Sequence, residues 1–428
     1  MNDLDTIARH HAEQARAAVA DARLPRLDIG RSRRVWRETR PAWAAVIGAA
    51  TVVLVLGLLR LPGGLEGDDD VAATTVPTST VIVGPEGGFV PTGSMTGRCA
   101  WCNAVLLDDG RVLIVGGVDE EGPIAEIYDP ATWTFTPTGR PPYSYPEITD
   151  AVLLDDGRVL VVGLSLSDNA VGIGPSNAAL YDPASGSFQS IDWPEGKGSA
   201  AVGLADGRVL VVGGQTRRDR ITAALFDPRL DRFTATGLPN VSWGFPVTAT
   251  LLDDGRVLVV GAEPSGMAEI YDPQTGTFTL TGSLSTARAG PTATRLVDGR
   301  VLIVGGGGEG SAALASAEIY DPDTGTFTPT GPMATARWGH AVAPLPDGRV
   351  LVVGGGGRVL VGGSDDAGDP SVEATAEIYD PLTGRFTQAP APTTSRLAAT
   401  AVSLTDGRVL VLGYYPGTVS GLGAVSKS

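Results

Sequence analysis

The chain is poor in the residue types that bind metals or form cross-links. Its 428 residues include two cysteines and three histidines, and His340 is the only histidine beyond residue 11. Protein sites for zinc and similar metals usually need several His, Cys or carboxylate ligands. The sequence also lacks a Gly-x-Ser-x-Gly nucleophile motif. We therefore expect no metal and no cofactor.

Positive charge is scarce beyond the first 40 residues. The whole chain has a net charge of −16. Residues 1–40 contain nine Arg and six Asp or Glu, which gives +3, so residues 41–428 carry −19. No basic stripe interrupts this acidic portion. Because nucleic-acid backbones are bound by clustered Lys and Arg, nucleic acid is excluded as a partner.

Long apolar runs are missing except at one place. Residues 42–59 form an uncharged run of 18 residues between Arg40 and Arg60, which is about the minimum for a membrane-spanning helix. Arginines precede the run and acidic residues follow it, so the positive-inside rule predicts a cytosolic N-terminus. We expect a single-pass protein of the cell membrane with a cytosolic segment at 1–40, a transmembrane signal anchor at 41–60 and a flexible stalk at 61–80. A cleaved signal peptide is the alternative.

What the sequence does contain is a repeat. The triplet Asp-Gly-Arg followed by an apolar run occurs seven times, at intervals of 47, 50, 48, 44, 49 and 59 residues. Repeats with a period in the forties that consist of short strand patterns are typical of β-propellers. The seven arginines are Arg111, Arg158, Arg208, Arg256, Arg300, Arg349 and Arg408.

Each repeat resolves into four strands. Asp-Gly between two apolar runs predicts a tight hairpin between the first and second strands. The third strand ends in an aromatic residue such as Tyr379, and a second aromatic, here Phe386, follows seven residues later in the fourth strand. Asp-Pro-x-Thr-Gly between them predicts the second hairpin turn. The nearly all-apolar second strands are typical of sheets buried on both faces.

The last repeat lacks its outer hairpin. Residues 398–412 supply only a first and a second strand, whereas residues 81–93 read as a degenerate outer hairpin. We therefore expect the last blade to be assembled from both ends of the chain, which leaves no free sheet edge. The predicted fold is all-β, a seven-bladed β-propeller over residues 81–413, preceded by one transmembrane helix and followed by a tail at 414–428.

The repeat resembles the kelch repeat. Its parts read Arg-x-Gly-His-Ala, Asp-Gly-Arg-Val-Leu-Val-Val-Gly-Gly and Glu-Ile-Tyr-Asp-Pro-x-Thr-Gly-x-Phe, in a bacterial form similar to the central domain of galactose oxidase. The resemblance covers about residues 81–413 and implies four-stranded kelch blades. Galactose oxidase and its relatives bind copper with two His and two Tyr. One histidine cannot build that site, so we expect His340 to be structural.

Differences in length between repeats gather on one face. From the Asp-Gly-Arg arginine to the third-strand aromatic, the spacings are 17, 23, 18, 15, 20 and 30 residues, whereas both hairpin turns keep one length. The 2–3 and 4–1 connections form what we name the variable face, and the hairpin turns form the opposite turn face. Variable loops on a rigid scaffold often carry binding residues. Aromatic and arginine side chains are common anchors there, although aromatics can instead pack between blades. The candidates are Tyr143, Tyr145, Trp193, Arg217, Arg218, Trp243 and Trp338.

The two cysteines form the motif Cys99-Ala100-Trp101-Cys102 at the start of the first repeat. A catalytic Cys-x-x-Cys normally opens a helix, whereas this one precedes a strand. In an extracytoplasmic domain the motif favours a local structural disulfide, with idle thiols as the alternative.

Together these features predict a membrane-anchored, extracytoplasmic binding module for a protein or a glycan. The first alternative is a carbohydrate-active enzyme that uses acidic loop residues such as Asp365 and Asp366. The second is a sensor that signals through the membrane helix to residues 1–40.

Overall fold

The computed structural model describes residues 78–83, 88–97, 99, 102–119, 122–142, 148–163, 176–193, 200–215, 221–241, 244–262, 266–308, 312–357, 374–392 and 397–414. All of them belong to the unit Leu65–Ser428. The predicted cytosolic segment 1–40, the anchor 41–60, most of the stalk and residues 415–428 of the tail lie outside the described residues.

Six four-stranded antiparallel sheets follow one another along the chain. Sheet 1 consists of β3 (Asn103–Leu106), β4 (Val112–Asp119), β5 (Gly122–Asp129) and β6 (Thr134–Pro137). Sheet 2 consists of β7 (Ile148–Leu153), β8 (Val159–Gly163), β9 (Ser176–Asp182) and β10 (Ser187–Trp193). Sheet 3 consists of β11 (Ala200–Gly203), β12 (Val209–Gln215), β13 (Ile221–Asp227) and β14 (Arg232–Ala235). Sheet 4 consists of β15 (Gly244–Leu251), β16 (Val257–Ala262), β17 (Met267–Asp272) and β18 (Thr277–Ser283). Sheet 5 consists of β19 (Thr292–Arg295), β20 (Val301–Val304), β21 (Ala317–Asp321) and β22 (Thr326–Pro329). Sheet 6 consists of β23 (Ala341–Pro344), β24 (Val350–Val353), β25 (Ala376–Asp380) and β26 (Arg385–Ala389).

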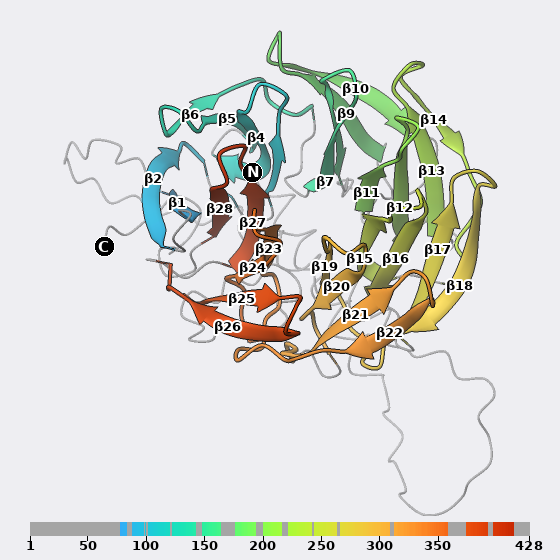
Figure 1. Ribbon diagram of the computed structural model, residues 1–428. Coiled ribbons are helices and arrows are strands. Elements are labelled where there is room, and N and C mark those ends of the chain that lie inside the picture. The colour runs from blue at the N-terminus through green and yellow to red at the C-terminus, as the bar shows by residue number, and fades with distance from the viewer. Residues whose placement is uncertain are drawn as a thin grey trace, which may run out of the picture. The chain divides into compact units, whose positions relative to one another are not determined.

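A seventh sheet joins the two ends of the repeat region. It has the order β2 (Phe89–Met95), β1 (Thr78–Val83), β28 (Val409–Tyr414), β27 (Leu397–Ser403). In its register Val81 lies opposite Val411 and Val83 lies opposite Val409. We name it the closing sheet. Figure 1 shows β1 and β2 beside β27 and β28, with the sheets arranged in a ring. The outer hairpin begins at Thr78, so the last residues of the predicted stalk belong to the propeller.

The prediction of an all-β propeller is confirmed. The parts of the chain that the structure describes contain no helix that is long and apolar enough to cross a membrane. The run 42–59, which the sequence predicts to do so, is not among them.

The Asp-Gly turns form because each turn satisfies its own polar groups. At the first one, the Leu107 N–H donates to the Arg111 carbonyl at 2.8 Å, and the Gly110 N–H donates to the Leu107 carbonyl at 2.9 Å. Gly110 has a φ of 84°, a region that glycine enters without steric cost. The Asp109 carboxylate accepts the backbone N–H and the Nε–H of Arg111. The turn is therefore determined locally, which explains its repetition.

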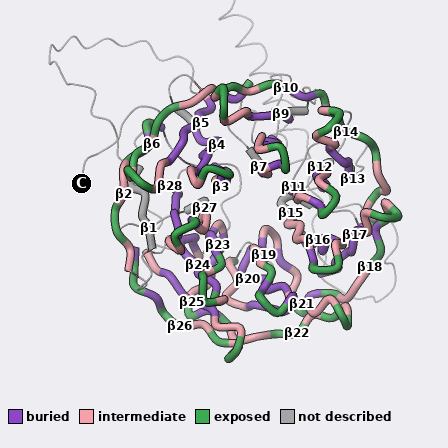
Figure 2. Tube along the Cα trace, turned by 45° about the horizontal axis from the view of Figure 1, so that its top comes forward, coloured by how far each residue is buried: buried purple, intermediate pink, exposed green. Residues whose placement is uncertain are grey.

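The hydrophobic core lies between neighbouring sheets. In β12, Leu210 and Val212 pack toward sheet 4, while Val209 and Val211 pack toward sheet 2. Successive residues of a strand point to opposite faces, so an all-apolar strand contributes to two interfaces. Figure 2 shows buried positions along these inner strands and exposed positions at the turns and outer strands. Each fully buried Val or Leu stabilises the fold by roughly 1.5–3 kcal/mol.

Pairs of Thr and Tyr hydroxyls, which we name Thr–Tyr latches, also join neighbouring sheets at their outer edges. The hydroxyl of Thr138 lies 2.9 Å from the hydroxyl of Tyr181 in the next sheet. Four further Thr–Tyr pairs of this kind join described residues at other junctions. At the junction of sheets 2 and 3, Ile191 replaces the threonine and Phe226 replaces the tyrosine. Both hydroxyls are lost together there, so neither is left without its partner.

Candidate functional site

Most of the candidate binding residues lie outside the described residues. These are Tyr143, Tyr145, Arg217, Arg218 and Trp243. Trp193 ends β10, where its backbone lies opposite Ser176. Their binding role therefore stays a prediction.

Trp338 is not displayed on the surface as the sequence suggested. Its side chain is 7 % exposed. Its backbone exchanges two hydrogen bonds of 3.0 Å with Gly356, which fixes the residue between the connections of sheet 6. The expectation of an exposed Trp338 is wrong, and the alternative of an aromatic packed within the propeller describes it. The backbone pairing with Gly356 holds Trp338 at a buried position.

Buried glutamates attach the connections of the variable face to the sheets. Glu318 in β21 accepts the backbone N–H groups of Ser285 and Thr286 at 2.8 and 3.2 Å. The buried Arg288 donates to the same carboxylate at 2.9 Å and to the carbonyls of Gly305 and Ser316. Burial lowers the pKa of Arg288, and the charge of Glu318 opposes that effect.

The same arrangement recurs in sheet 6. Arg337 donates to Glu377 at 3.2 Å and to the Gly354 carbonyl at 2.8 Å. Because an isolated buried charge is very unfavourable, each arginine and its glutamate depend on each other. The pairs make the bases of the variable-face loops rigid. A glutamate within an otherwise apolar third strand was the sequence signal for them.

His340 is a structural residue in this fold. It is buried, and its Nε2 lies 2.9 Å from the hydroxyl of Thr292 in the preceding sheet. Burial, with a smaller effect of the Arg337 charge, lowers its pKa to about 3. The imidazole is therefore neutral at physiological pH and joins sheets 5 and 6.

Asp150 is a residue that the sequence analysis missed. It lies in the innermost strand β7 and is half-buried. Its carboxylate accepts the N–H of Ala151 and, across the junction to sheet 3, the N–H of Ala201, both at 2.8 Å. Burial raises its pKa to about 6, against the opposing effect of these two hydrogen bonds. An alignment of the repeats on their Asp-Gly turns would have found it, because the corresponding residues are Asn103, Ala200, Thr248, Thr292, Ala341 and Thr400.

The cysteines lie inside the first junction. Cys99 and Cys102 form a disulfide. They are 1 % and 5 % exposed and pack with Met95 and Tyr128. A disulfide this buried is shielded from attacking thiols, which is consistent with a structural role.

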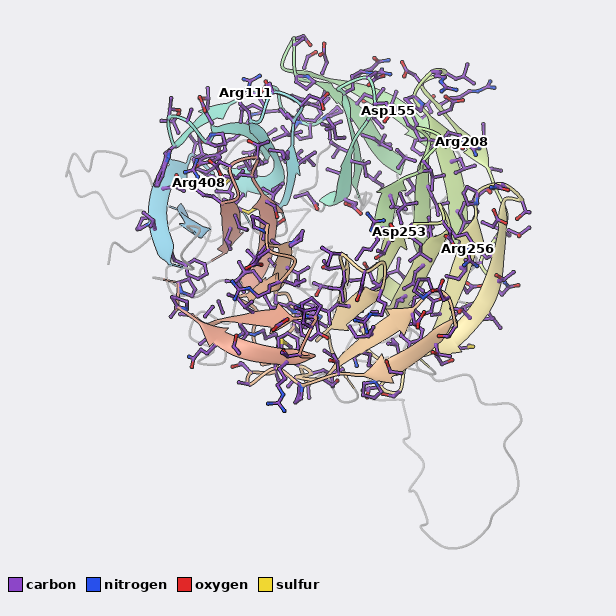
Figure 3. All side chains as sticks on the ribbon, viewed as in Figure 1. Arg111, Asp155, Arg208, Asp253, Arg256 and Arg408 are labelled. Carbon is purple, nitrogen blue, oxygen red and sulfur yellow. A yellow bond between two sulfur atoms is a disulfide. The ribbon has the colours of Figure 1, made fainter. Side chains whose placement is uncertain are left out.

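The turn face is a ring of paired charges. Each Asp-Gly-Arg arginine lies 2.6 Å from the aspartate of its own turn. Four of these arginines, Arg111, Arg208, Arg256 and Arg408, are spread around the ring in Figure 3. At Asp109 the hydrogen bond from Arg111 lowers the pKa of the carboxyl. Exposed pairs of this kind stabilise by roughly 0–1 kcal/mol.

A cleft of about 650 Å³ opens on the turn face between sheets 3 and 4. Polar side chains from both sheets line it, with apolar contributions from Leu204 and Pro273. The polar residues are Asp206, Arg208, Asp254, Arg256, Asp272 and Gln274.

Within the described residues, no three His, Cys, Asp or Glu side chains are grouped as a metal site would require. The motif of the kelch family matches residues 288–334, which run from Arg288 through sheet 5. This match and the four-stranded sheets around the ring together support a kelch propeller. The protein is a kelch-repeat β-propeller.

One solved structure similar to this kelch propeller is a fungal alcohol oxidase of the AA5 family in complex with copper. The two share 18 % identity and a TM-score of 0.59, over 77 % of this chain and 78 % of the oxidase chain. At this identity the likeness shows the fold alone. No curated protein matches the chain.

The kelch propeller does not have the residues for a copper site of the kind that galactose oxidase uses. Its one histidine is bonded to Thr292, and both of its cysteines are in a disulfide. A second imidazole is absent from the propeller sequence.

Proposed function

We propose that this protein is a single-pass membrane protein whose extracytoplasmic propeller, with seven kelch blades, binds a protein or a glycan through its variable face. The apolar run 42–59, with arginines before it and acidic residues after it, supports the anchor. The seven four-stranded sheets among the described residues support this blade number.

The contrast between the two faces carries the proposal. On the turn face, seven near-identical Asp-Gly-Arg turns bond mainly to themselves and their neighbours. On the variable face, buried Glu–Arg pairs hold the bases of connections that differ in length and sequence. Specific recognition needs a distinctive surface on a rigid support, and the variable face fits that requirement.

The test compares one variant on each face. Full-length wild type, Trp243→Ala and Asp347→Asn are used to capture partners from cell-envelope extract, and each melting temperature is measured. Trp243→Ala should weaken capture about tenfold with an unchanged melting temperature, and Asp347→Asn should capture normally. Equal losses from both folded variants would refute the assignment to the variable face.

The anchor is tested separately. Protease added to intact cells should degrade the propeller and spare residues 1–40. A mature chain that begins after Leu59 would show that the segment is a cleaved signal peptide.

The enzyme alternative requires two or three titratable groups that converge on one pocket. Asp150 has a raised pKa, but its carboxylate is bonded to two backbone amides. No observation on the described residues favours catalysis over binding. The sensor alternative predicts a phenotype on deletion of residues 1–34 while export persists.

A further inference from the structure

The junction between sheets 2 and 3 contains a carboxylate that the other described junctions lack. Arg158 of sheet 2 binds Asp156 of its own turn through Nε and Nη2, at 2.9 and 2.6 Å. It also makes a two-pronged contact with Asp231 of sheet 3, with distances of 3.1 and 2.8 Å. Bidentate pairing of this kind is the geometry in which a guanidinium recognises a carboxylate.

Asp231 reaches Arg158 because of where it stands in its turn. It has a φ of 49° and occupies the last position of the turn between the third and fourth strands. Four other sheets have glycine at that position: Gly186, Gly276, Gly325 and Gly384. Trp133 of sheet 1 is the other exception, with a φ of 63°. It also covers an arginine of the preceding sheet, since Arg408 lies 5.1 Å above its ring.

The junction between sheets 3 and 4 has the same parts without the covering side chain. Arg208 binds Asp206 at 2.8 and 2.6 Å and contacts the Pro273 carbonyl at 3.4 Å. Gly276 stands where sheet 3 has Asp231. Among the described residues, Nη1 of Arg208 has no hydrogen-bond partner. The 650 Å³ cleft opens beside this guanidinium, and the Arg208 side chain is 32 % exposed, compared with 24 % for Arg158.

The remaining walls of the cleft are suited to hydroxyl groups. Asp254, Asp272 and Gln274 offer oxygen acceptors, and Arg256 offers donors. The volume is in the range of sites for small molecules. We propose that this cleft binds a uronate, a sugar ring with a carboxylate. The carboxylate lies on Arg208 as that of Asp231 lies on Arg158, and the ring hydroxyls face Asp272 and Gln274.

Two of the three aspartates that line the cleft are neutralised by arginines. Asp206 and Asp254 are each paired with an arginine of their own turn, as Asp156 is at the junction that holds Asp231. Asp272 corresponds to Asp227 in sheet 3, whereas Gln274 stands where sheet 3 has Arg229 and Ala205 stands where sheet 2 has Asp155. The site lies on the turn face and is independent of the proposed partner on the variable face.

The test follows the reactivity of single arginines in the full-length protein. Phenylglyoxal modification is mapped by peptide mass spectrometry with methyl glucuronoside, with methyl glucoside as the ring without a carboxylate, or with acetyl-aspartate amide as an acidic peptide group. Ionic strength is held constant. The glucuronoside should slow modification of Arg208 at least threefold and leave the modification rate of Arg158 unchanged. The glucoside should change the modification rate of neither arginine.

Two reciprocal variants make the test specific. Gly276→Asp supplies the carboxylate in the protein, so Arg208 should react slowly and gain no further protection from the sugar. Asp231→Gly opens the other junction, so Arg158 should become reactive and be protected by the glucuronoside. A Cβ at residue 276 would meet the Thr236 hydroxyl, which is bonded to Tyr271, at 3.2 Å. Residue 276 has a φ of 68°, and Asp231 also has a positive φ at the matching position. Melting temperatures verify that the variants fold.

Three results would overturn the proposal. The first is no protection of Arg208 by the glucuronoside. The second is equal protection of all exposed arginines, which indicates screening by charge alone. The third is stronger protection by acetyl-aspartate amide than by the sugar, which assigns the cleft to an acidic protein segment.

Discussion

The hydroxyl of Thr92 in β2 lies 3.0 Å from the hydroxyl of Tyr128 in β5. These residues join the closing sheet to sheet 1, and the Gly93 N–H donates to the Trp133 carbonyl at 3.1 Å beside them. The closing sheet contains strands from both ends of the repeat region. The Thr–Tyr latch that links successive repeats elsewhere therefore also closes the ring.

Removal of the latch at the closing junction should weaken the whole propeller. Thr92→Val and Tyr128→Phe should each lower the free energy of unfolding by about 1 kcal/mol, because each leaves one hydroxyl without its partner. The double variant should lose less than the sum of the two, with a coupling energy of roughly 0.5–1.5 kcal/mol. Urea unfolding of the four proteins measures this. Strict additivity would show that the two hydroxyls do not interact.

Trp338 should behave as a core residue. Trp338→Ala removes a buried indole and should destabilise the fold by about 3–5 kcal/mol. Leu382 is 95 % exposed, so Leu382→Ala is the matched control and should leave the melting temperature unchanged. A Trp338→Ala protein that melts like the wild type but loses its partner would restore the residue as a surface anchor.

Asp150 should make stability depend on pH in an unusual direction. Its pKa is raised to about 6 in the fold, from 3.8, so the folded state holds the proton more tightly than the unfolded state does. Ionised Asp150 destabilises the fold above about pH 6, and this penalty disappears as the pH falls toward 4.

The measurement compares wild type with Asp150→Asn by urea unfolding between pH 7.5 and pH 4. The wild type should gain stability relative to the variant on acidification, whatever their difference at neutral pH. Parallel curves for the two proteins would contradict the raised pKa.

Loss of the disulfide should be tolerated. Cys99 and Cys102 close a loop of very few residues, so chain entropy limits the stabilisation to at most about 2 kcal/mol. The double variant Cys99→Ala, Cys102→Ala should fold and unfold cooperatively. Because both cysteines are buried in the wild-type protein, thiol reductants should reduce the disulfide only after denaturation. A variant that fails to fold would assign the disulfide a larger role.

Much of the architecture could be predicted because it is built from local signals. An Asp-Gly turn satisfies its own hydrogen bonds, so each hairpin can be recognised from a few residues such as Leu107 to Arg111. Seven copies of that turn predicted the sheets, and the incomplete last copy predicted the pairing of β1 with β28. The pairing of Cys99 with Cys102 followed from the absence of any other cysteine.

The properties of individual side chains depended on neighbours that are distant in sequence. Tryptophan is a residue type that often anchors partners at a surface, but Trp338 is buried in this fold. The pKa of Asp150 depends on the packing around its carboxylate and on an amide 51 residues further along the chain. The cleft at Arg208 is lined by residues of sheets 3 and 4, such as Asp206 and Asp272, that only the packing of the two sheets brings together. The sequence by itself determined the repeat and its turns, whose interactions are local, whereas burial and the space between sheets were decided by tertiary packing alone.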